Sequence, residues 1–387
     1  MRVLLASTSG AGHLGPLVPF AHALRRAGHE ILVAAPISAY ARVERTGLPS
    51  ISFADPLERD LAPVWERVRA AAPDEANRLV LGELFGRVRS RAALPGIELA
   101  MDAWRPDIVL RESCEFASAV AAEAREIPVA RVGAFLLMVE EYTIRAAAPA
   151  VDELRQWVGL ASDPAGERLT ASPYLTLTPA SFELPEGEAP PHTRRFHSAP
   201  PPLRAVRPAG TPPLVYLSFG SVAASIGYFP GLYREVIDAL ADLPIRLLVT
   251  VGETADPAAL GPLPAHVRAE RWIPQAEVFT EADAMVGHGG FGTTMGALLA
   301  GVPQVVVPLF ADQPYNAQRI AGLRAGLTAR SEDPASVRAA VERLLAEPAF
   351  RFAAGRVALE AQGLPAIDDA PAALEALVAA GREERAA

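Results

Sequence analysis

Two histidines in glycine-rich stretches are the residues best suited to chemistry. His13 lies in "STSGAGHLGP" (residues 7–16), and His288 lies in "GHGGFGTT" (residues 287–294). Each stretch follows a run of apolar residues that predicts a buried β-strand. Because imidazole gains and loses its proton near neutral pH, a histidine at a strand end can accept a proton from a hydroxyl or donate a hydrogen bond.

The glycines of the first stretch admit another interpretation. Gly10, Gly12 and Gly15 have the spacing of a dinucleotide-binding fingerprint, in which glycines allow a tight turn and close approach to a pyrophosphate. That fingerprint also needs an acidic residue near the end of the second strand. The second predicted strand ends in "VAAP" without one, and Pro16 follows the third glycine. We therefore favour a loop that presents His13, and a nicotinamide-dependent oxidoreductase is the minor alternative.

A histidine base works best beside a carboxylate, which orients the ring and stabilises its imidazolium form. Glu112 ends the predicted strand "PDIVLRE", so it should reach the same sheet edge as His13, and Glu115 lies one turn further. We predict Glu112 as the partner, with Glu115 as the alternative. From position alone, His13 could equally be a helix-start residue bonded to its own loop, and either acid could be solvated or paired with Arg111.

The stretch around His288 has the composition of a diphosphate site. Successive glycines let backbone N–H groups converge, and a helix predicted to begin at about Thr293 favours an anion at its N-terminus. These glycines are Gly289, Gly290 and Gly292. His288, the threonine hydroxyls and Ser221 of "SFGS" (218–221) add further donors. A turn that needs glycine only for its backbone angles is the alternative, but it would require neither a histidine nor two threonines.

Short apolar runs that alternate with helical patterns predict how these loops are positioned. The runs lie at 2–8, 30–36, 106–112, 127–133, 214–221, 245–252, 282–290 and 302–310, with a helix from about 116 to 125 and another at 368–387. Such alternation is typical of right-handed βαβ units and parallel sheets, which bind ligands at the carboxyl ends of their strands. Residues 185–213 contain nine prolines, which indicates a linker rather than an element.

Length and composition limit the classes of protein to which this chain can belong. A chain of 387 residues is long enough for two domains, and 50% hydrophobic with 21% charged residues is a globular composition. The net charge of −9, without a basic and aromatic cluster, argues against nucleic acid as a partner. The one cysteine, Cys114, excludes an internal disulfide and is predicted to be buried. Without a signal peptide or an apolar run of membrane length, we expect a cytoplasmic protein with no membrane partner.

Together these motifs resemble the nucleotide-sugar glycosyltransferases of family 1, which include plant natural-product enzymes and bacterial enzymes that decorate antibiotics. The resemblance covers nearly the whole chain. It rests on "GHLGP", "FGS" and a series of Trp272, Gln275, His288, "GG.GT", Asp312 and Gln313. It implies an α/β GT-B fold, in which two Rossmann-like domains with parallel sheets face a central cleft. The expected parts are an acceptor-binding domain at 1–200, a proline-rich linker at 201–213, a donor-binding domain at 214–366, and a C-terminal helix at 367–387 that returns to the first domain.

The resemblance also implies roles for residues of the first domain. His13 would be the general base that deprotonates the acceptor hydroxyl, and Glu112 lies where many members have an aspartate partner. Apolar residues in the variable stretch 55–95 and after the strand at 127–133 are candidates for the acceptor pocket, although apolar residues at helical spacing also build cores. The candidates are Trp65, Phe85, Phe135, Met138 and Tyr142. As a set they suggest a flat, apolar acceptor such as a polyketide or macrolide.

In the second domain, the resemblance assigns donor binding to the specific carboxyl-terminal motif. Trp272 would stack on the nucleobase, and His288, Thr293 and Ser221 would bind the diphosphate. Asp312 and Gln313 would bind hydroxyls of the donor sugar. Gln275, Gly289, Gly290 and Gly292 complete the predicted donor site.

The expected reaction is a single displacement that inverts the anomeric carbon, with a nucleotide sugar as co-substrate and no metal or cofactor. Gly296 stands where many family members have a glutamate that holds both ribose hydroxyls of uridine, so we predict a thymidine diphosphate (deoxy)sugar rather than UDP-glucose. A non-catalytic GT-B protein that binds nucleotide sugars in a biosynthetic complex is the second hypothesis. The acceptor, the sugar, the choice among O-, N- and C-glycosides, and a monomer or homodimer stay open.

Overall fold

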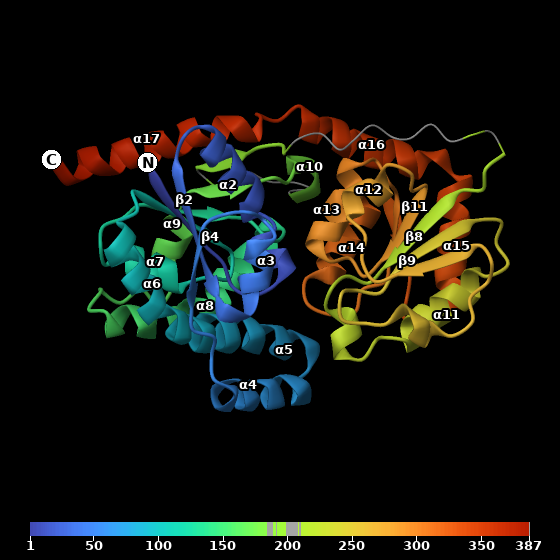
Figure 1. The fold of residues 1–387 in the computed structure, drawn as a ribbon, viewed down its shortest axis with the longest axis horizontal. Helices are drawn as coiled ribbons and strands as arrows, with labels where there is room; N and C mark the ends of the chain where they lie inside the picture. Colours follow the sequence, from blue (N-terminus) through green and yellow to red (C-terminus); the bar gives the residue numbers. More distant parts are fainter. Residues whose placement is uncertain (184–188, 191, 199–207, 209, 387) are drawn as a thin grey trace. The chain divides into compact units, whose positions relative to one another are not determined.

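The computed structural model describes residues 1–183, 189–190, 192–198, 208 and 210–386. The chain divides into two compact units, each built on its own sheet (Figure 1). Unit 1 comprises Met1–Leu177, Glu186–Ser198 and Pro365–Ala387, and unit 2 comprises Thr178–Pro185 and Ala199–Leu364. Most of the predicted linker, residues 201–207 and 209, lies outside the described residues.

Unit 1 contains a seven-stranded sheet in the order β3-β2-β1-β4-β5-β6-β7. Every neighbouring pair of these strands is parallel. The strands are β1 (Arg2–Ala6), β2 (Glu30–Pro36), β3 (Ser50–Phe53), β4 (Ile108–Glu112), β5 (Val129–Val132), β6 (Tyr174–Thr176) and β7 (Thr193–Arg195). The strand order reverses between β1 and β4, which is where open α/β sheets bind their ligands.

Helices cover both faces of this sheet because successive side chains of a strand point to opposite faces. Val3 and Leu5 pack with α2, α3 and α17, whereas Leu4 packs with α6, α7 and α8. The helices of unit 1 are α1 (Ala11–Leu14), α2 (Leu17–Arg26), η1 (Ile37–Ala39), α3 (Tyr40–Glu44), α4 (Glu58–Ala70), α5 (Pro73–Leu79), η2 (Val80–Arg89), α6 (Ser90–Trp104), α7 (Ala117–Glu123), α8 (Leu137–Trp157), α9 (Glu167–Ala171), η5 (Ile367–Asp369) and α17 (Ala370–Ala386).

Unit 2 contains a six-stranded parallel sheet in the order β10-β9-β8-β11-β12-β13. Its strands are β8 (Leu214–Ser218), β9 (Arg246–Thr250), β10 (Val267–Glu270), β11 (Ala284–Gly287), β12 (Gln304–Val306) and β13 (Gly326–Thr328). Its helices are α10 (Ala180–Glu183), η3 (Ala223–Ile226), α11 (Gly231–Leu240), η4 (Pro257–Leu260), α12 (Gln275–Phe279), α13 (Phe291–Leu299), α14 (Gln313–Gly322), α15 (Pro334–Ala346) and α16 (Pro348–Gln362).

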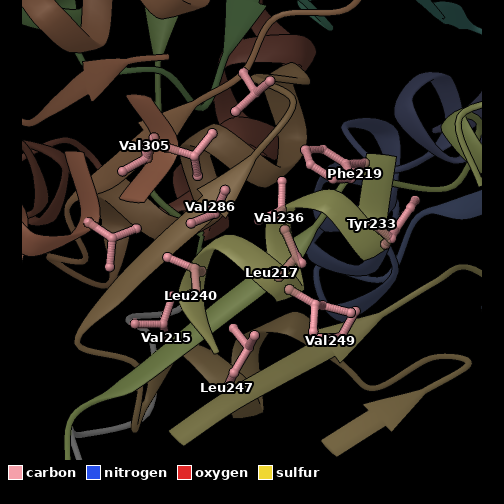
Figure 2. Packing of buried hydrophobic residues seen from close by; sticks show 14 of the residues in the cluster. Val215, Leu217, Phe219, Tyr233, Val236, Leu240, Leu247, Val249, Val286 and Val305 are labelled. Carbon is pink, nitrogen blue, oxygen red and sulfur yellow. The ribbon is translucent and has the colours of Figure 1, made fainter. Parts of the chain in front are cut away.

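The core of unit 2 lies on both faces of its sheet. On one face, Leu217 and Val249 pack against Val236 and Leu240 of α11 (Figure 2). On the other face, Tyr216 packs with residues of α12 and α13. Alternate residues of β8 therefore serve opposite layers, as they do in β1.

The prediction of parallel α/β sheets is confirmed, and each of the eight predicted runs contains a strand. The prediction that 185–213 holds no element was wrong, because β7 (Thr193–Arg195) lies within it and pairs with β6. Strands of three or four residues, including β3, β6, β10 and β13, are too short to show a periodic pattern. Cys114 is a buried free thiol, as predicted.

Residues 178–185 group with unit 2, although they precede the boundary expected at residue 200. Arg319 of α14 donates a hydrogen bond from Nε to the carbonyl oxygen of Phe182, at 2.8 Å. The Phe182 ring lies 6.3 Å from the ring of Phe291, centroid to centroid. These contacts attach α10 to the helices of the second sheet.

Among the described residues, no helix combines the length and the apolar character that crossing a membrane would require.

Candidate functional site

The opening loop carries His13 from the end of β1 into α1. Gly10 is the N-cap of α1 and has a φ of 124°, a conformation that side-chain-bearing residues rarely adopt. At Gly15, a Cβ atom would lie 2.8 Å from the carbonyl oxygen of Ala11. At least two of the three glycines are thus required by the backbone of the turn itself.

His13 and Glu112 form a hydrogen-bonded pair at the reversal point of the first sheet. Nδ1 of His13 lies 2.9 Å from Oε2 of Glu112, and the side chains are 17% and 0% exposed. The other carboxylate oxygen accepts hydrogen bonds from the backbone N–H of Thr8 at 3.1 Å and from its hydroxyl at 2.8 Å. The backbone N–H of Cys114 donates to Oε2 at 2.8 Å. The carboxylate is therefore held by four donors in the protein interior.

This environment keeps Glu112 ionised. Burial by itself raises the pKa of a carboxyl group, but the facing imidazole and the N–H groups of Cys114 and Thr8 outweigh burial and lower the pKa of Glu112 to about 2. An ionised carboxylate only accepts hydrogen bonds, so Nδ1 of His13 must carry the proton that joins them. Nε2 of the neutral ring is then the atom that can accept a proton from a ligand.

Glu115, the alternative acid, points to a different partner. Its carboxylate accepts hydrogen bonds from the backbone N–H of Ser118, at 3.2 Å, and from the Ser118 hydroxyl. Burial raises the pKa of Glu115 to about 7. Of the two acids, Glu112 is the one that contacts His13, and the catalytic roles of both partners stay predictions.

Two of the five predicted acceptor residues surround the imidazole. The ring centroids of Phe85 and Phe135 lie 5.2 Å and 5.9 Å from that of His13. Trp65 on α4 is 37% exposed and Met138 on α8 is 48% exposed, and Tyr142 on α8 is half-buried. Contact of all five with an acceptor stays a prediction.

Sequence reasoning missed the residues that hold Glu112 in place. Thr8 is the second residue after β1, and β1 pairs with β4, so its position beside Glu112 could have been found from the predicted sheet. Cys114 acts through its backbone N–H, for which the residue type carries no signal.

The donor atoms of His13, Glu112 and Cys114 lie within 4.8 Å of one another, a spacing that could hold a metal ion. The imidazole and the carboxylate already bind each other, however, and burial raises the pKa of the Cys114 thiol well above its usual value. A protonated thiol is a poor metal ligand. The arrangement therefore suits proton transfer better than metal binding.

In unit 2, His288 lies between the end of β11 and the start of α13. It is 9% exposed, and two glycines flank its ring. A Cβ atom at Gly220 would lie 2.6 Å from Cε1 of His288, and one at Gly290 would lie 2.3 Å from Nε2. Burial lowers the pKa of His288 to about 4, which the backbone of Ser218 only partly offsets. At neutral pH this imidazole is uncharged.

A chain of hydrogen bonds fixes the first turn of α13. Thr293 donates from Oγ1 to Oε1 of Gln275 at 3.3 Å, and Nε2 of Gln275 donates to the hydroxyl of Tyr216 at 3.3 Å. The Tyr216 hydroxyl lies 2.7 Å from Oγ1 of Thr250, which in turn donates to Oγ of Ser218 at 3.0 Å. Because the first N–H groups of a helix lack partners within it, this turn presents fixed donors to an anion.

Asn316 joins the glycine loop to the beginning of α14. Its side-chain amide donates to the carbonyl oxygen of Gly289 at 2.8 Å and to Oδ2 of Asp312 at 2.7 Å. Gln313 is 2% exposed, and its Oε1 accepts two backbone N–H groups of the preceding loop, at 2.7 and 2.9 Å. Gln313 therefore shapes this loop with its oxygen and can offer its amide NH₂ to a ligand.

The remaining predicted donor residues are exposed. Trp272, which follows β10, is 60% exposed, and Ser221 is exposed in the loop after β8. Both are accessible to a ligand, and their contacts with a nucleotide stay predictions.

Gly296 lies against a buried aromatic ring. A Cβ atom at this position would be 3.0 Å from Cε2 of Phe279, which is 3% exposed. Phe279 also packs edge-on against Tyr216, with ring centroids 5.8 Å apart. A longer side chain at residue 296 would have to displace Phe279.

Comparison with known proteins gives matches over both units. Residues 22–190 match the family described as erythromycin biosynthesis protein CIII-like, N-terminal domain, and residues 234–377 match its C-terminal domain. The chain is 33% identical to L-demethylnoviosyl transferase of Streptomyces niveus, covering 93% of this chain and 94% of that protein. It is also 33% identical to the elloramycin glycosyltransferase ElmGT of Streptomyces olivaceus, covering 97% of each. The crystal structure of the glycosyltransferase SnogD from Streptomyces nogalater matches with a TM-score of 0.77 and 28% identity, over 98% of this chain and 99% of that one.

Proposed function

Because the chain belongs to the EryCIII-like family of antibiotic-pathway glycosyltransferases, we propose that it moves a sugar from a nucleoside diphosphate sugar to a hydroxyl of an apolar natural product, with His13 as general base. The observation that supports this role is the His13–Glu112 pair, in which Nδ1 is bonded to a buried carboxylate. A ring that is oriented in this way offers Nε2 to a substrate proton.

The proposed step is one displacement. Nε2 of His13 takes the proton of the acceptor hydroxyl, and Glu112 stabilises the resulting imidazolium ion. The hydroxyl oxygen forms a bond to the anomeric carbon of the donor while the bond from that carbon to the diphosphate oxygen breaks. Because the oxygen attacks opposite the leaving group, the anomeric configuration inverts. The product is a glycoside, and the nucleoside diphosphate leaves with the bonding electrons.

The leaving diphosphate gains negative charge, which N–H and O–H donors can stabilise without a metal. We assign this task to the first turn of α13, the glycines around His288, and Thr293, whose hydroxyl would turn its proton from Oε1 of Gln275 to a phosphate oxygen. Asp312 and Gln313 would bind the sugar, and Trp272 the nucleobase. The uncharged His288 contributes as a hydrogen-bonding group rather than as a cation.

The donor is proposed to be a thymidine diphosphate (deoxy)sugar. Gly296 offers no side chain for a ribose 2′-hydroxyl, and Phe279 occupies the space beside it. Turnover with matched thymidine and uridine diphosphate sugars checks this choice. A preference for the uridine donor would contradict it and would leave the UDP-glucose-dependent transferase as the better assignment.

The decisive experiment compares His13→Ala with His22→Ala, a histidine of α2 outside the His13–Glu112 pair. We expect His13→Ala to reduce transfer about 10³-fold, within the range for loss of a general base. Binding of thymidine diphosphate, measured by calorimetry, should be unchanged in both variants. Full transfer by His13→Ala would remove this residue from the mechanism, and no donor hydrolysis or transfer by the wild-type chain would favour a non-catalytic auxiliary protein.

A further inference from the structure

Arg89 is a cation without a carboxylate partner. It is the last residue of η2 and half-buried, and its Nη1 donates to the hydroxyl of Ser9. Its Nε is buried and has no hydrogen-bond partner, and across the described part of the chain no carboxylate lies within ion-pair distance of it. Burial lowers the pKa of Arg89. A partly desolvated guanidinium is costly unless an anion pairs with it, so its presence here needs an explanation.

The neighbouring acids are engaged elsewhere. Asp55 accepts hydrogen bonds from the backbone N–H and hydroxyl of Ser38, and Glu112 is bonded to His13. By contrast Arg87, two residues before Arg89 on the same helix, pairs with Glu83 and Glu153. The missing partner is thus specific to Arg89 and not a property of the helix.

The Arg89 guanidinium and the His13 imidazole both lie near the ring of Phe85. The Cζ atom of Arg89 is 5.2 Å from the centroid of the Phe85 ring, and the His13 ring is 5.2 Å from the same centroid. Ser9, which accepts the hydrogen bond of Arg89, belongs to the loop that carries His13. Arg89 and His13 are therefore connected through one aromatic ring and one loop.

The helix that carries Phe85 and Arg89 packs closely on its neighbour. It is a π-helix, a rare conformation that is frequent at functional sites. Two glycines allow it to pack closely on α8: a Cβ atom at Gly82 would lie 2.6 Å from the carbonyl oxygen of Ala146, and one at Gly86 would lie 3.1 Å from Cβ of Ala147. The two functional side chains therefore have a fixed support.

Beside the guanidinium is a small cavity of about 10 Å³. That volume is close to the minimum for one water-sized group, so it suits a single ligand oxygen atom. Its polar lining comes from Arg89, Thr8, Ser90, Cys114 and Glu115, and apolar residues of the β2 and β3 ends complete it. Two lining residues, Thr8 and Cys114, also donate hydrogen bonds to the Glu112 carboxylate that binds His13, so the cavity lies beside the support of the His13 site.

We propose that Arg89 and this cavity form an anion subsite of the acceptor site, which receives a carboxylate or ionised enol oxygen adjacent to the hydroxyl that His13 deprotonates. This inference rests on the proposed function. The planar guanidinium fork matches an oxyanion pair, and its bond to a charged oxygen is stronger than one to a neutral oxygen.

The test uses salicylate, which carries a carboxylate next to a hydroxyl, and its methyl ester. Binding of each to the full chain is measured by calorimetry without donor, in wild type and in Arg89→Gln, Arg89→Lys and Arg87→Gln. Wild type should bind the acid about tenfold or more tightly than the ester, and Arg89→Gln should weaken the acid alone by about 10- to 100-fold, as for a lost charge-assisted bond. Arg89→Lys should restore part of the preference, and Arg87→Gln should retain all of it.

Equal binding of acid and ester by wild type would overturn the subsite, and so would an Arg89→Gln variant that weakens both ligands alike. The second result would mean that Arg89 only supports the loop through Ser9. Repeating the titrations in His13→Ala separates this inference from the proposed function. If His13→Ala still binds the acid more tightly than the ester, the subsite is supported whether or not this variant transfers sugar. If the wild-type chain transfers sugar to neutral acceptors but shows no preference for the acid, the proposed function is supported and the subsite is contradicted.

Discussion

The two histidines, His13 and His288, lie in opposite electrostatic environments. Nδ1 of His13 lies 2.9 Å from the buried carboxylate of Glu112. That carboxylate also accepts hydrogen bonds from the backbone N–H and the hydroxyl of Thr8 and from the backbone N–H of Cys114, which keep it ionised. His288 has no carboxylate partner among the described residues and lies between Gly220 and Gly290, where burial lowers its pKa to about 4. One imidazole faces a fixed negative charge, and the other is kept neutral.

The difference fits the two roles that we propose for these sites. A general base needs a fixed counter-charge for its imidazolium ion, and Glu112 at the reversal point between β1 and β4 would supply it. A diphosphate site needs close approach of backbone N–H groups, which the glycines and the helix start of the second sheet would allow. A carboxylate beside His288 would repel such a ligand.

The largest expected effect comes from removing the charge beside His13. Glu112→Gln keeps the shape of the side chain but cannot stabilise an imidazolium ion, and the amide can turn its NH₂ toward the ring and favour the wrong tautomer. We expect kcat to fall about 10⁴-fold, as on loss of a triad carboxylate. Steady-state kinetics measure this, with Glu98→Gln on α6 as the control. An unchanged kcat would show that the contact is only structural.

The second prediction concerns the pH dependence of stability, because the pKa shifts of Glu112 and Glu115 have opposite signs. The folded-state pKa of Glu115 is raised from 4.5 to about 7, so the native state holds this proton over a pH range in which the unfolded state releases it. Stability from this group is therefore present below about pH 4.5 and is lost as the pH rises through 7. Between pH 5 and 7.5 the loss should be on the order of 2 to 3 kcal/mol, from 1.36 kcal/mol per pKa unit.

Chemical denaturation at these two pH values measures that loss. Glu115→Gln cannot titrate, so its free energy of unfolding should fall less than that of wild type between pH 5 and 7.5. Parallel pH dependences of the two proteins would contradict the assigned direction. The lowered pKa of Glu112 has the opposite sign, because its contribution is present above about pH 4.5 and is lost only as the pH falls toward 2.

The third prediction adds a methyl group at Gly290, next to the ring of His288. In Gly290→Ala the new Cβ atom would lie 2.3 Å from Nε2 of His288, so the ring must move. Overpacking of this kind costs about 1 to 3 kcal/mol, and we expect thymidine diphosphate to bind about tenfold more weakly. Gly355→Ala in α16, where a Cβ atom meets nothing within 4 Å, is the matched control. Nucleotide affinity that is unchanged in Gly290→Ala would mean that His288 does not contribute to the donor site.

The sequence alone could predict the parts of this comparison that depend on long apolar runs and strand ends. His13 and Glu112 were expected at one sheet edge because His13 follows a recognisable strand and Glu112 ends another, and the glycines around His288 mark a strand-to-helix turn. The choice of Glu112 over Glu115 required the geometry. Glu112 is still part of β4, whereas Glu115 turns back to the N–H of Ser118 at the start of α7.

Other features had no sequence signal. Three-residue strands such as β7 are set by pairing with a neighbour rather than by periodicity. The lack of a carboxylate partner for Arg89 can be recognised only from the positions of Asp55 and Glu112, because Arg87 on the same helix has carboxylate partners. Spacing along the chain predicts where residues lie, but not which of them lack a partner.

The smallest expected effect is the difference between two threonine deletions, one in each site. Thr8→Val removes a hydroxyl that donates at 2.8 Å to the buried, ionised Glu112, and Thr293→Val removes one that donates at 3.3 Å to the neutral amide of Gln275. Hydrogen bonds to charged groups contribute about 1.5 to 3 kcal/mol and neutral ones about 0.5 to 1.5, so Thr8→Val should cost about 1 kcal/mol more. Urea unfolding at pH 7.5 compares the two variants with wild type. Equal costs, or a larger cost for Thr293→Val, would mean that the charge on Glu112 is stabilised mainly by His13 and the backbone, and that the two sites differ less than their geometry indicates.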